Sequence, residues 1–230
     1  MPPDTAGHPS RPLTRGSVTV RPWTRHDVAF LSMVSSLETN PWAPVPLGLS
    51  AAQWLSELEA TADRGDLGFI IEVQGVEADE SAGITGSAGI TGKADDAGRD
   101  TRPAPAGLLT LGAFDPHHRV AEITGYWVLP RLRGRGVAAT AIDLVTGWAI
   151  ASLGYARIQI FTRPDNVGSR VAALRAGFAE EGVLRSFVEV AGERSDAVVL
   201  SRVHPVSPVP TERNAPRALD AADQAPAHLR

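Results

Sequence analysis

The chain has 230 residues, of which 43% are apolar and 21% are charged, and its formal net charge is −4. This composition excludes a disordered chain, and the acidic balance argues against nucleic acid as a partner. No run of about 18 apolar residues occurs and the N-terminus has no apolar stretch, so we expect a cytoplasmic protein without a membrane partner. The absence of cysteine excludes disulfides, thiolate metal sites and cysteine nucleophiles.

Three stretches are predicted to lie outside the packed core. Residues 1–15 and 204–230 are rich in proline and in small or polar residues, and we expect disordered tails there. Residues 76–105 are acidic and glycine-rich and carry the hexapeptide SAGITG twice in tandem, which indicates a loop insertion. The rest of the chain, within residues 16–203, is long enough for one domain.

The first half of the chain alternates between strand and helix patterns. Alternating or short apolar runs bounded by turn residues predict strands at residues 17–22, 67–73, 108–113 and 120–128. The last of these is expected to run antiparallel to its predecessor. Helical spacing behind the N-cap candidates Thr24 and Ser50 predicts helices at residues 24–37 and 50–64.

The second half begins with the strongest helix pattern, at residues 137–153, where one apolar stripe ends before Gly154. A short helix capped by Asp165 is predicted next, and its apolar positions recur at helical spacing: Val167, Val171 and Leu174. Further strands are predicted at residues 157–161, 183–190 and 197–203. Hairpins followed by one central crossover indicate a mixed sheet in an α/β (α+β) domain.

The segment that joins the strand at 120–128 to the helix at 137–153 has the composition of an anion site. It reads Arg131-Leu132-Arg133-Gly134-Arg135-Gly136-Val137-Ala138. Glycine lets the main chain approach a ligand, and the unpaired amides of a helix's first turn favour a negative group. Guanidinium groups suit phosphate oxygens. The segment therefore predicts a pyrophosphate site.

Two other interpretations of this segment are open. Gly134-x-Gly136-x-x-Ala139 also matches a dinucleotide-binding fingerprint, which would make the protein a nucleotide-dependent oxidoreductase. Against that interpretation, the motif follows a series of hairpins, and the next strand has no acidic residue at its tip to hold a ribose. The other interpretation is an arginine-rich surface turn that opens a helix.

Arg131-x-x-Gly134-x-Gly136 resembles the acetyl-CoA pyrophosphate loop of the GNAT superfamily of acyl-CoA-dependent N-acyltransferases. Residues 164–172, followed by 176–178 and 181–185, are similar to the second cofactor segment of the branch that includes the ribosomal-protein alanine and serine N-terminal acetyltransferases. The resemblance covers about residues 16–203. It implies a mixed, mostly antiparallel sheet of about seven strands with about four helices and a V-shaped cofactor cleft. Residues 121–125 are one residue longer than the usual form, which suggests a strand bulge.

The resemblance implies acetyl-CoA as the acyl-donor co-substrate. The main chain of Trp127 and Val128 is expected to pair with the pantetheine arm, and residues 133–138 to enclose the pyrophosphate. Asn166 matches a family asparagine that contacts the pantetheine, with helix capping as the alternative. The expected cofactor-binding residues are Trp127, Val128, Arg131, Arg133, Gly134, Arg135, Gly136, Val137, Ala138, Asn166 and Ser169.

Acetyl transfer requires a neutral amine, and deprotonating an alkylamine at neutral pH costs about 4 kcal/mol. The resemblance makes Glu122 the candidate general base, although strand alternation could also turn its side chain to solvent. Ser169 stands at the position whose side chain assists the departing thiolate, where many relatives have tyrosine. Tyr126 is the phenol nearest in sequence, and we interpret it as a packing residue. No metal site is predicted, because the adjacent His117 and His118 should point to opposite faces.

The expected function is transfer of an acetyl group to a primary amine by direct attack in a ternary complex. The acceptor would be a protein N-terminus or a small-molecule amine, and the sequence does not choose between them. The alternatives are the oxidoreductase above and a non-catalytic acyl-CoA sensing module. The resemblance also allows a homodimer.

Overall fold

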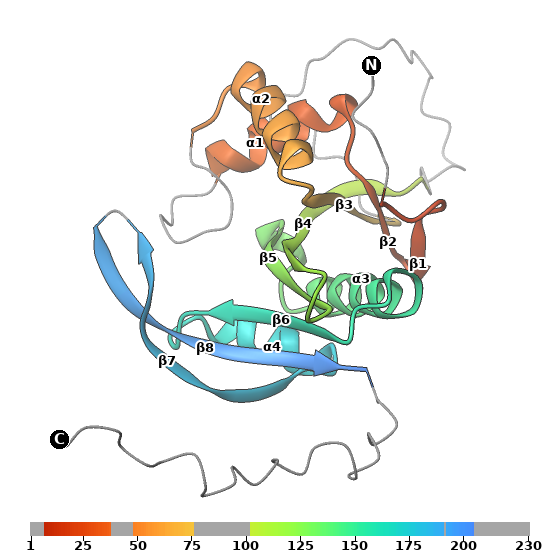
Figure 1. Ribbon diagram of the computed structural model, residues 1–230. Coiled ribbons are helices and arrows are strands. Elements are labelled where there is room, and N and C mark those ends of the chain that lie inside the picture. Colours follow the sequence, from red (N-terminus) through yellow and green to blue (C-terminus); the bar gives the residue numbers. More distant parts are fainter. Residues whose placement is uncertain (1–6, 38–47, 76–101, 191, 205–230) are drawn as a thin grey trace, which may run out of the picture.

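The computed structural model describes residues 7–37, 48–75, 102–190 and 192–204. In these ranges, eight strands form one sheet in the order β1-β2-β3-β4-β5-β6-β8-β7, with four α-helices around it (Figure 1). The strands are β1 Leu13–Arg15, β2 Val18–Pro22, β3 Leu67–Val73, β4 Ala104–Asp115, β5 Val120–Val128, β6 Arg157–Thr162, β7 Ala179–Val190 and β8 Glu193–Val203. The helices are α1 Val28–Leu37, α2 Ala51–Asp63, α3 Val137–Leu153 and α4 Val167–Arg175.

The mixed, mostly antiparallel sheet that the sequence predicts is confirmed, and within the described sheet β5 and β6 are the one parallel pair. The predicted bounds of β3, β5 and α3 coincide with the observed ones. These are the segments with the longest uninterrupted periodic patterns, so local sequence alone determines their extent.

Several boundaries differ from the prediction, and both β7 and β8 begin four residues earlier than predicted, at Ala179 and Glu193. Leu13–Arg15, placed in the N-terminal tail by the sequence, forms β1 against β2, which brings the described strands to eight rather than seven. Ala104 and Pro105, placed in the insertion, are the first residues of β4 and pair with the end of β3. Both segments are too short to show a strand pattern and depend on a neighbouring strand. The rest of the insertion, residues 76–101, and the C-terminal residues 205–230 lie outside the described part of the chain.

The short helix α4 is capped by a residue other than the predicted one. Asn166 is the N-cap, since its side chain accepts a hydrogen bond from the Ser169 amide at 3.1 Å, whereas Asp165 pairs with Arg163 at 2.6 Å. The helix packs through small side chains such as Ala173, which is fully buried. The three apolar positions at helical spacing are exposed instead: Val167, Val171 and Leu174.

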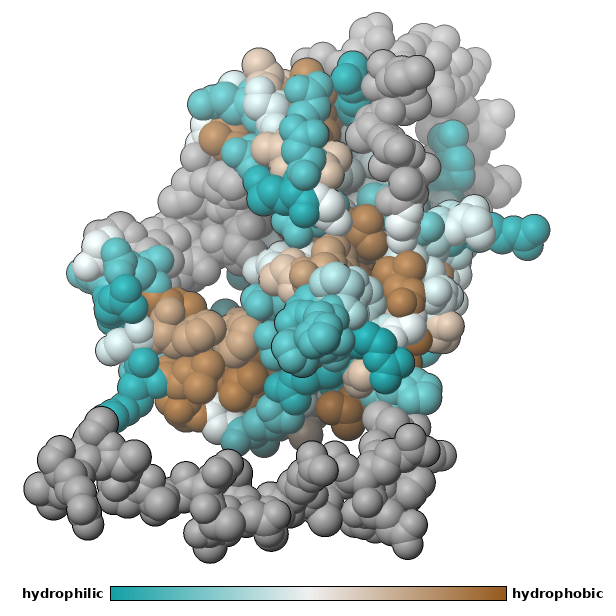
Figure 2. Space-filling model, viewed as in Figure 1, coloured by the Kyte–Doolittle hydropathy of each residue, from teal (hydrophilic) through white to brown (hydrophobic). Residues whose placement is uncertain are grey.

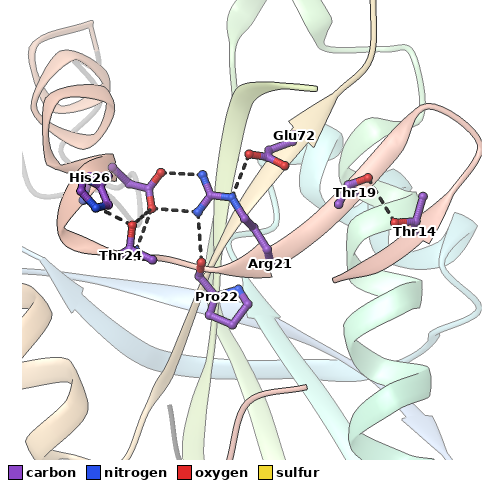
Figure 3. A network of polar contacts seen from close by, with 8 residues as sticks. Thr14, Thr19, Arg21, Pro22, Thr24, His26 and Glu72 are labelled. Atoms are coloured by element: carbon purple, nitrogen blue, oxygen red, sulfur yellow. Dashed lines mark hydrogen bonds and ion pairs between the residues drawn. The ribbon is translucent and has the colours of Figure 1, made fainter. Parts of the chain in front are cut away.

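The two faces of the sheet are covered differently. On one face, α3 packs across the sheet from β1 and β2 to β5, and the Trp148 ring of α3 meets the Phe69 ring of β3 edge-on at 6.0 Å. On the other face, Arg21 of β2 donates to both oxygens of Asp27 at 2.7 and 2.8 Å and to Glu72 of β3 at 2.8 Å (Figure 3). Asp27 ends the 3₁₀ turn that precedes α1, so this ion-pair network fixes the start of α1 to the sheet. Among the described residues, no helix is long and apolar enough to cross a membrane.

Candidate active site

The strands β5 and β6 separate beside the N-terminus of α3. They pair at only three positions, the last of which joins Glu122 to Gln159. From Ile123 onward, no strand in the described part of the chain pairs with β5 on this side, and Figure 1 shows the two ribbons diverging. Backbone groups along this edge of β5 are therefore open to an extended ligand, which can bind as an added strand does.

The loop between β5 and α3 contains two glycines in the left-handed region. Gly134 has φ +76° and Gly136, the N-cap of α3, has φ +82°. Within the described ranges, no backbone or side-chain acceptor is bonded to the amides of residues 134–138. The first turn of a helix leaves such amides pointing outward at the positive end of the helix dipole. The loop therefore has the donors and the electrostatic field that a pyrophosphate requires.

One of the three loop arginines folds back onto β5. Arg133 Nε donates to the Val128 carbonyl at 3.0 Å, and its guanidinium lies 5.5 Å from the centre of the Trp127 ring. The carbonyl of Val128, which the sequence interpretation assigned to the pantetheine arm, thus already has a partner in this structure. Arg131 and Arg135 are exposed on the loop.

A bulge in β5 determines which face each of its side chains occupies. Glu122 pairs with Gly112 of β4, but two rungs later Gly125 pairs with Thr110, so Thr124 has no partner on β4. The extra residue reverses the alternation beyond it. Glu122 and Tyr126 consequently lie on opposite faces of the sheet, although they are four positions apart and would share a face in a regular strand. The bulge that the longer strand suggested is confirmed.

Tyr126 lies on the face covered by α3, because its partner on β4, Leu109, in turn pairs with Phe69. Its hydroxyl reaches α4, where it donates to the Ser169 carbonyl at 3.0 Å and contacts Ser169 Oγ at 2.5 Å. Burial raises the pKa of Tyr126, and the hydrogen bond with Ser169 opposes that shift. The interpretation of Tyr126 as a packing residue is therefore incomplete, because the side chain is also a polar partner of a predicted site residue.

Glu122 lies on the opposite face, where its side chain is half-buried. Burial raises the pKa of its carboxyl group from 4.5 to about 7. A carboxyl group with a pKa near neutrality can accept a proton and release it again, which is the property of a general base. The alternative that strand alternation left open, in which the Glu122 side chain is fully exposed to solvent, is not observed.

A second carboxylate, not identified from the sequence, lies next to Glu122. A Cβ atom on Gly112, its cross-strand neighbour, would stand 2.2 Å from Asp66 Oδ1, so the Asp66 side chain occupies the space that Gly112 leaves. Directly opposed residues have Cβ positions about 5 Å apart, which places Asp66 beside Glu122. Arg64 Nε donates to Asp66 at 3.2 Å. The sequence did not predict this neighbour, because it depends on the absence of a side chain at Gly112, which is far from Asp66 in sequence.

An apolar surface adjoins the face that carries Glu122. Gln159, the partner of Glu122, and Phe161 lie on the same face of β6. The Phe161 ring lies 4.7 Å from that of Phe187 on β7. Phe187 is 49% exposed, and Leu184 is 37% exposed nearby on β7. Figure 2 shows this apolar area over the ends of β6, β7 and β8. Among the described residues, no three His, Asp or Glu side chains gather to hold a metal ion.

Comparison with known proteins agrees with this geometry. Residues 17–179 match the family model described as the acetyltransferase (GNAT) domain, which covers most of the chain. The chain belongs to the GNAT acetyltransferase family. It is 36% identical over 107 residues to the uncharacterized N-acetyltransferase YoaA of Bacillus subtilis, an alignment that covers 46% of this chain and 59% of YoaA. It is 33% identical over 79 residues to the ribosomal-protein-serine acetyltransferase of Escherichia coli, which covers 34% of this chain and 44% of that protein.

The chain thus spans about half the length of the curated relatives that it matches. A solved structure is similar to this chain over most of the length of both proteins. Mycobacterium smegmatis RimJ in complex with CoA-disulfide superposes with a TM-score of 0.61 at 26% identity, covering 86% of this chain and 89% of RimJ. The dinucleotide-binding interpretation is wrong, because a Rossmann domain needs a parallel sheet, and here antiparallel neighbours precede the glycine loop.

Proposed function

We propose that this protein transfers an acetyl group from acetyl-CoA to a primary amine by direct attack in a ternary complex. The observation that carries the proposal is the combination of outward-pointing amides at residues 134–138 with the open edge of β5. The pyrophosphate of acetyl-CoA binds the loop amides, together with Arg131 and Arg135, and the pantetheine extends along β5 past Val128 and Trp127 toward Ile123. Asn166 and Ser169, at the start of α4, lie beside the reactive end of the arm.

The chemical step uses the two faces of β5. The neutral amine of the acceptor approaches from the face of Glu122 and attacks the thioester carbon, and the Glu122 carboxylate takes the proton that the nitrogen loses, directly or through a water molecule. The carbon–sulfur bond then breaks and the sulfur leaves toward the opposite face, where Tyr126 holds Ser169 and where the thiolate takes a proton from water. The bulge at Thr124 separates base and leaving-group sides in this way.

The site also favours a class of acceptor. Asp66 and Glu122 attract a cationic amine, and the surface of Phe161, Phe187 and Leu184 suits an apolar group attached to it. A protein N-terminus with an apolar first residue, or a small amine with an apolar body, has both parts. The match to a ribosomal-protein-serine acetyltransferase supports the first of these.

Binding of the donor is tested by thermal denaturation and by substitution of a loop glycine. Acetyl-CoA at 100 times its Kd should stabilise the fold by about 2.7 kcal/mol, which is a rise in Tm of about 5 °C or more, and NAD(H) should give none. Gly136→Ala should weaken acetyl-CoA binding at least about tenfold, because a side chain at φ +82° strains the loop and moves its amides.

Gly154→Ala is the matched control. Gly154 caps the other end of α3 with φ +76°, and at both glycines a Cβ atom would meet open space. Both variants should therefore lose similar stability, while only Gly136→Ala loses affinity. Equal affinity in the two variants would contradict the loop assignment. Thiol release from acetyl-CoA with a panel of N-terminal peptides and small amines tests catalysis, and tight binding without release for any acceptor would favour a sensing module.

A further inference from the structure

Ser169 is held by three contacts that come from two different elements. Its amide donates to Asn166 Oδ1 at 3.1 Å within α4. Its carbonyl accepts from the Tyr126 hydroxyl at 3.0 Å, and its Oγ lies 2.5 Å from the same hydroxyl. Tyr126 belongs to β5, so the serine is fixed to the strand whose open edge adjoins it. A serine needed only for helix formation requires no such support.

The single proton of the Tyr126 hydroxyl decides where the Ser169 proton points. When Tyr126 donates to the carbonyl, the serine hydroxyl completes the network by donating to the phenol oxygen. When Tyr126 donates to Oγ, the serine proton is released to donate to a different acceptor. The two arrangements differ only by rotation of hydroxyl groups, because all three heavy atoms stay in place.

We propose that Tyr126 is a positioning residue for acetyl transfer, which orients the Ser169 hydroxyl so that it donates a hydrogen bond to the departing CoA sulfur. The proposal rests on the proposed function, and it deepens that function at the leaving-group side. In the step itself the amine nitrogen bonds to the thioester carbon, and its proton passes to Glu122. The carbon–sulfur bond breaks with its electron pair on sulfur, and the resulting thiolate takes a proton from water.

The environment of Tyr126 keeps this network intact at neutral pH. Burial raises the pKa of the phenol, and the Ser169 hydrogen bond opposes the shift without reversing it. The phenol is therefore protonated when Glu122, on the other face, loses its proton. Above about pH 7, therefore, the phenol keeps its proton while Glu122 is ionised.

The decisive variant is Tyr126→Phe, with Tyr155→Phe as the matched control. Tyr155 is the other tyrosine of the chain, and its ring packs 5.4 Å from that of Phe114 rather than against Ser169. Tyr126→Phe should lower kcat about fivefold to tenfold, as expected for loss of one hydrogen bond, with KM for acetyl-CoA changed less than twofold. Tyr155→Phe should leave both constants unchanged.

A double-mutant cycle separates orientation from packing. Ser169→Ala should give the same loss of kcat alone, and adding Tyr126→Phe to it should cost nothing further. Independent losses in the double variant, or an effect confined to KM, would overturn the inference while leaving the proposed function standing. Wild-type protein that binds acetyl-CoA but acetylates no amine in the panel would overturn the proposed function and this inference together. Because Ser169→Ala lies on the surface turn of α4, it provides the kcat measurement even where Tyr126→Phe fails to fold.

Discussion

Two carboxyl groups on one side of the sheet, the buried Asp27 and the half-buried Glu122, have opposite electrostatic surroundings. Asp27 receives two hydrogen bonds from Arg21 and one from the Thr24 amide, whereas Glu122 accepts no hydrogen bond within the described part of the chain. Burial alone would raise the pKa of both. The bonds and charge of Arg21 hold the pKa of Asp27 below its ordinary value, while the pKa of Glu122 rises to about 7. A buried carboxylate paired with a cation stays ionised and stabilises the fold, whereas one without a cation has a raised pKa and can act as a base near neutral pH.

The strongest way to break this contrast is Glu122→Gln. The amide keeps the shape of the side chain but accepts no proton, so kcat should fall about 100-fold or more, the usual contribution of a general base. Steady-state thiol release measures it. Glu181→Gln is the control, since this exposed carboxyl is bonded to Arg157 and should be dispensable for turnover. A Glu122→Gln enzyme within threefold of wild type would show that another group accepts the proton.

Asp27→Asn should lower the stability of the fold rather than the rate of catalysis. It leaves Arg21 with Glu72 as its remaining charged partner, so the free energy of unfolding should fall by about 2 kcal/mol, somewhat less than for a fully orphaned buried charge. Urea denaturation gives this value. The folded fraction should keep its kcat, and a loss of kcat comparable to that of Glu122→Gln would contradict a purely structural role.

The pH dependence of stability should differ in sign for the two groups. Asp27 has a depressed pKa, so its contribution is present above about pH 4 and is lost as the pH falls below that value. Glu122 has a raised pKa, so the folded protein holds a proton that the unfolded chain releases, and stability should decline as the pH rises from about 4.5 to about 7.

Unfolding free energies of wild type and Glu122→Gln at pH 5 and pH 8 test this sign. The decline in wild type should be on the order of 1 kcal/mol, since the side chain is only partly screened from solvent, and it should be absent in the variant. In the same range, kcat/KM of wild type should rise with pH through about 7 as Glu122 loses its proton. A flat or falling profile would show that the protonation of Glu122 does not control catalysis.

The sequence predicted what depends on local pattern. The strands β3 and β5 and the helix α3 were bounded correctly because each has a continuous periodic run. The cap of α4 was not, because Asp165 and Asn166 are adjacent and equally good cap residues, and only the Ser169 amide distinguishes them. The exposed stripe of that helix shows the same limit, since helical spacing identifies a face without saying whether anything packs on it.

The candidate site was predicted unevenly for a related reason. The loop glycines and Glu122 stand in motifs that can be recognised in one dimension. Asp66 is next to Glu122 only because Gly112, forty-six positions away, has no side chain, and Tyr126 meets Ser169 only because β5 is out of step with β4 at one rung. Such contacts depend on the register of paired strands, which a single chain segment does not contain.

Because of the bulge at Thr124, the number of residues in β5 determines which face of the sheet Glu122 and Tyr126 occupy, as much as the identity of those residues does. Deleting Thr124 would leave every motif of the chain intact and yet carry the phenol of Tyr126 across the sheet to the carboxylate of Glu122. An insertion or deletion of one position is therefore the smallest genetic change that could move these two groups between opposite faces and a shared face, and an alignment that treats this position as a neutral gap would overlook it.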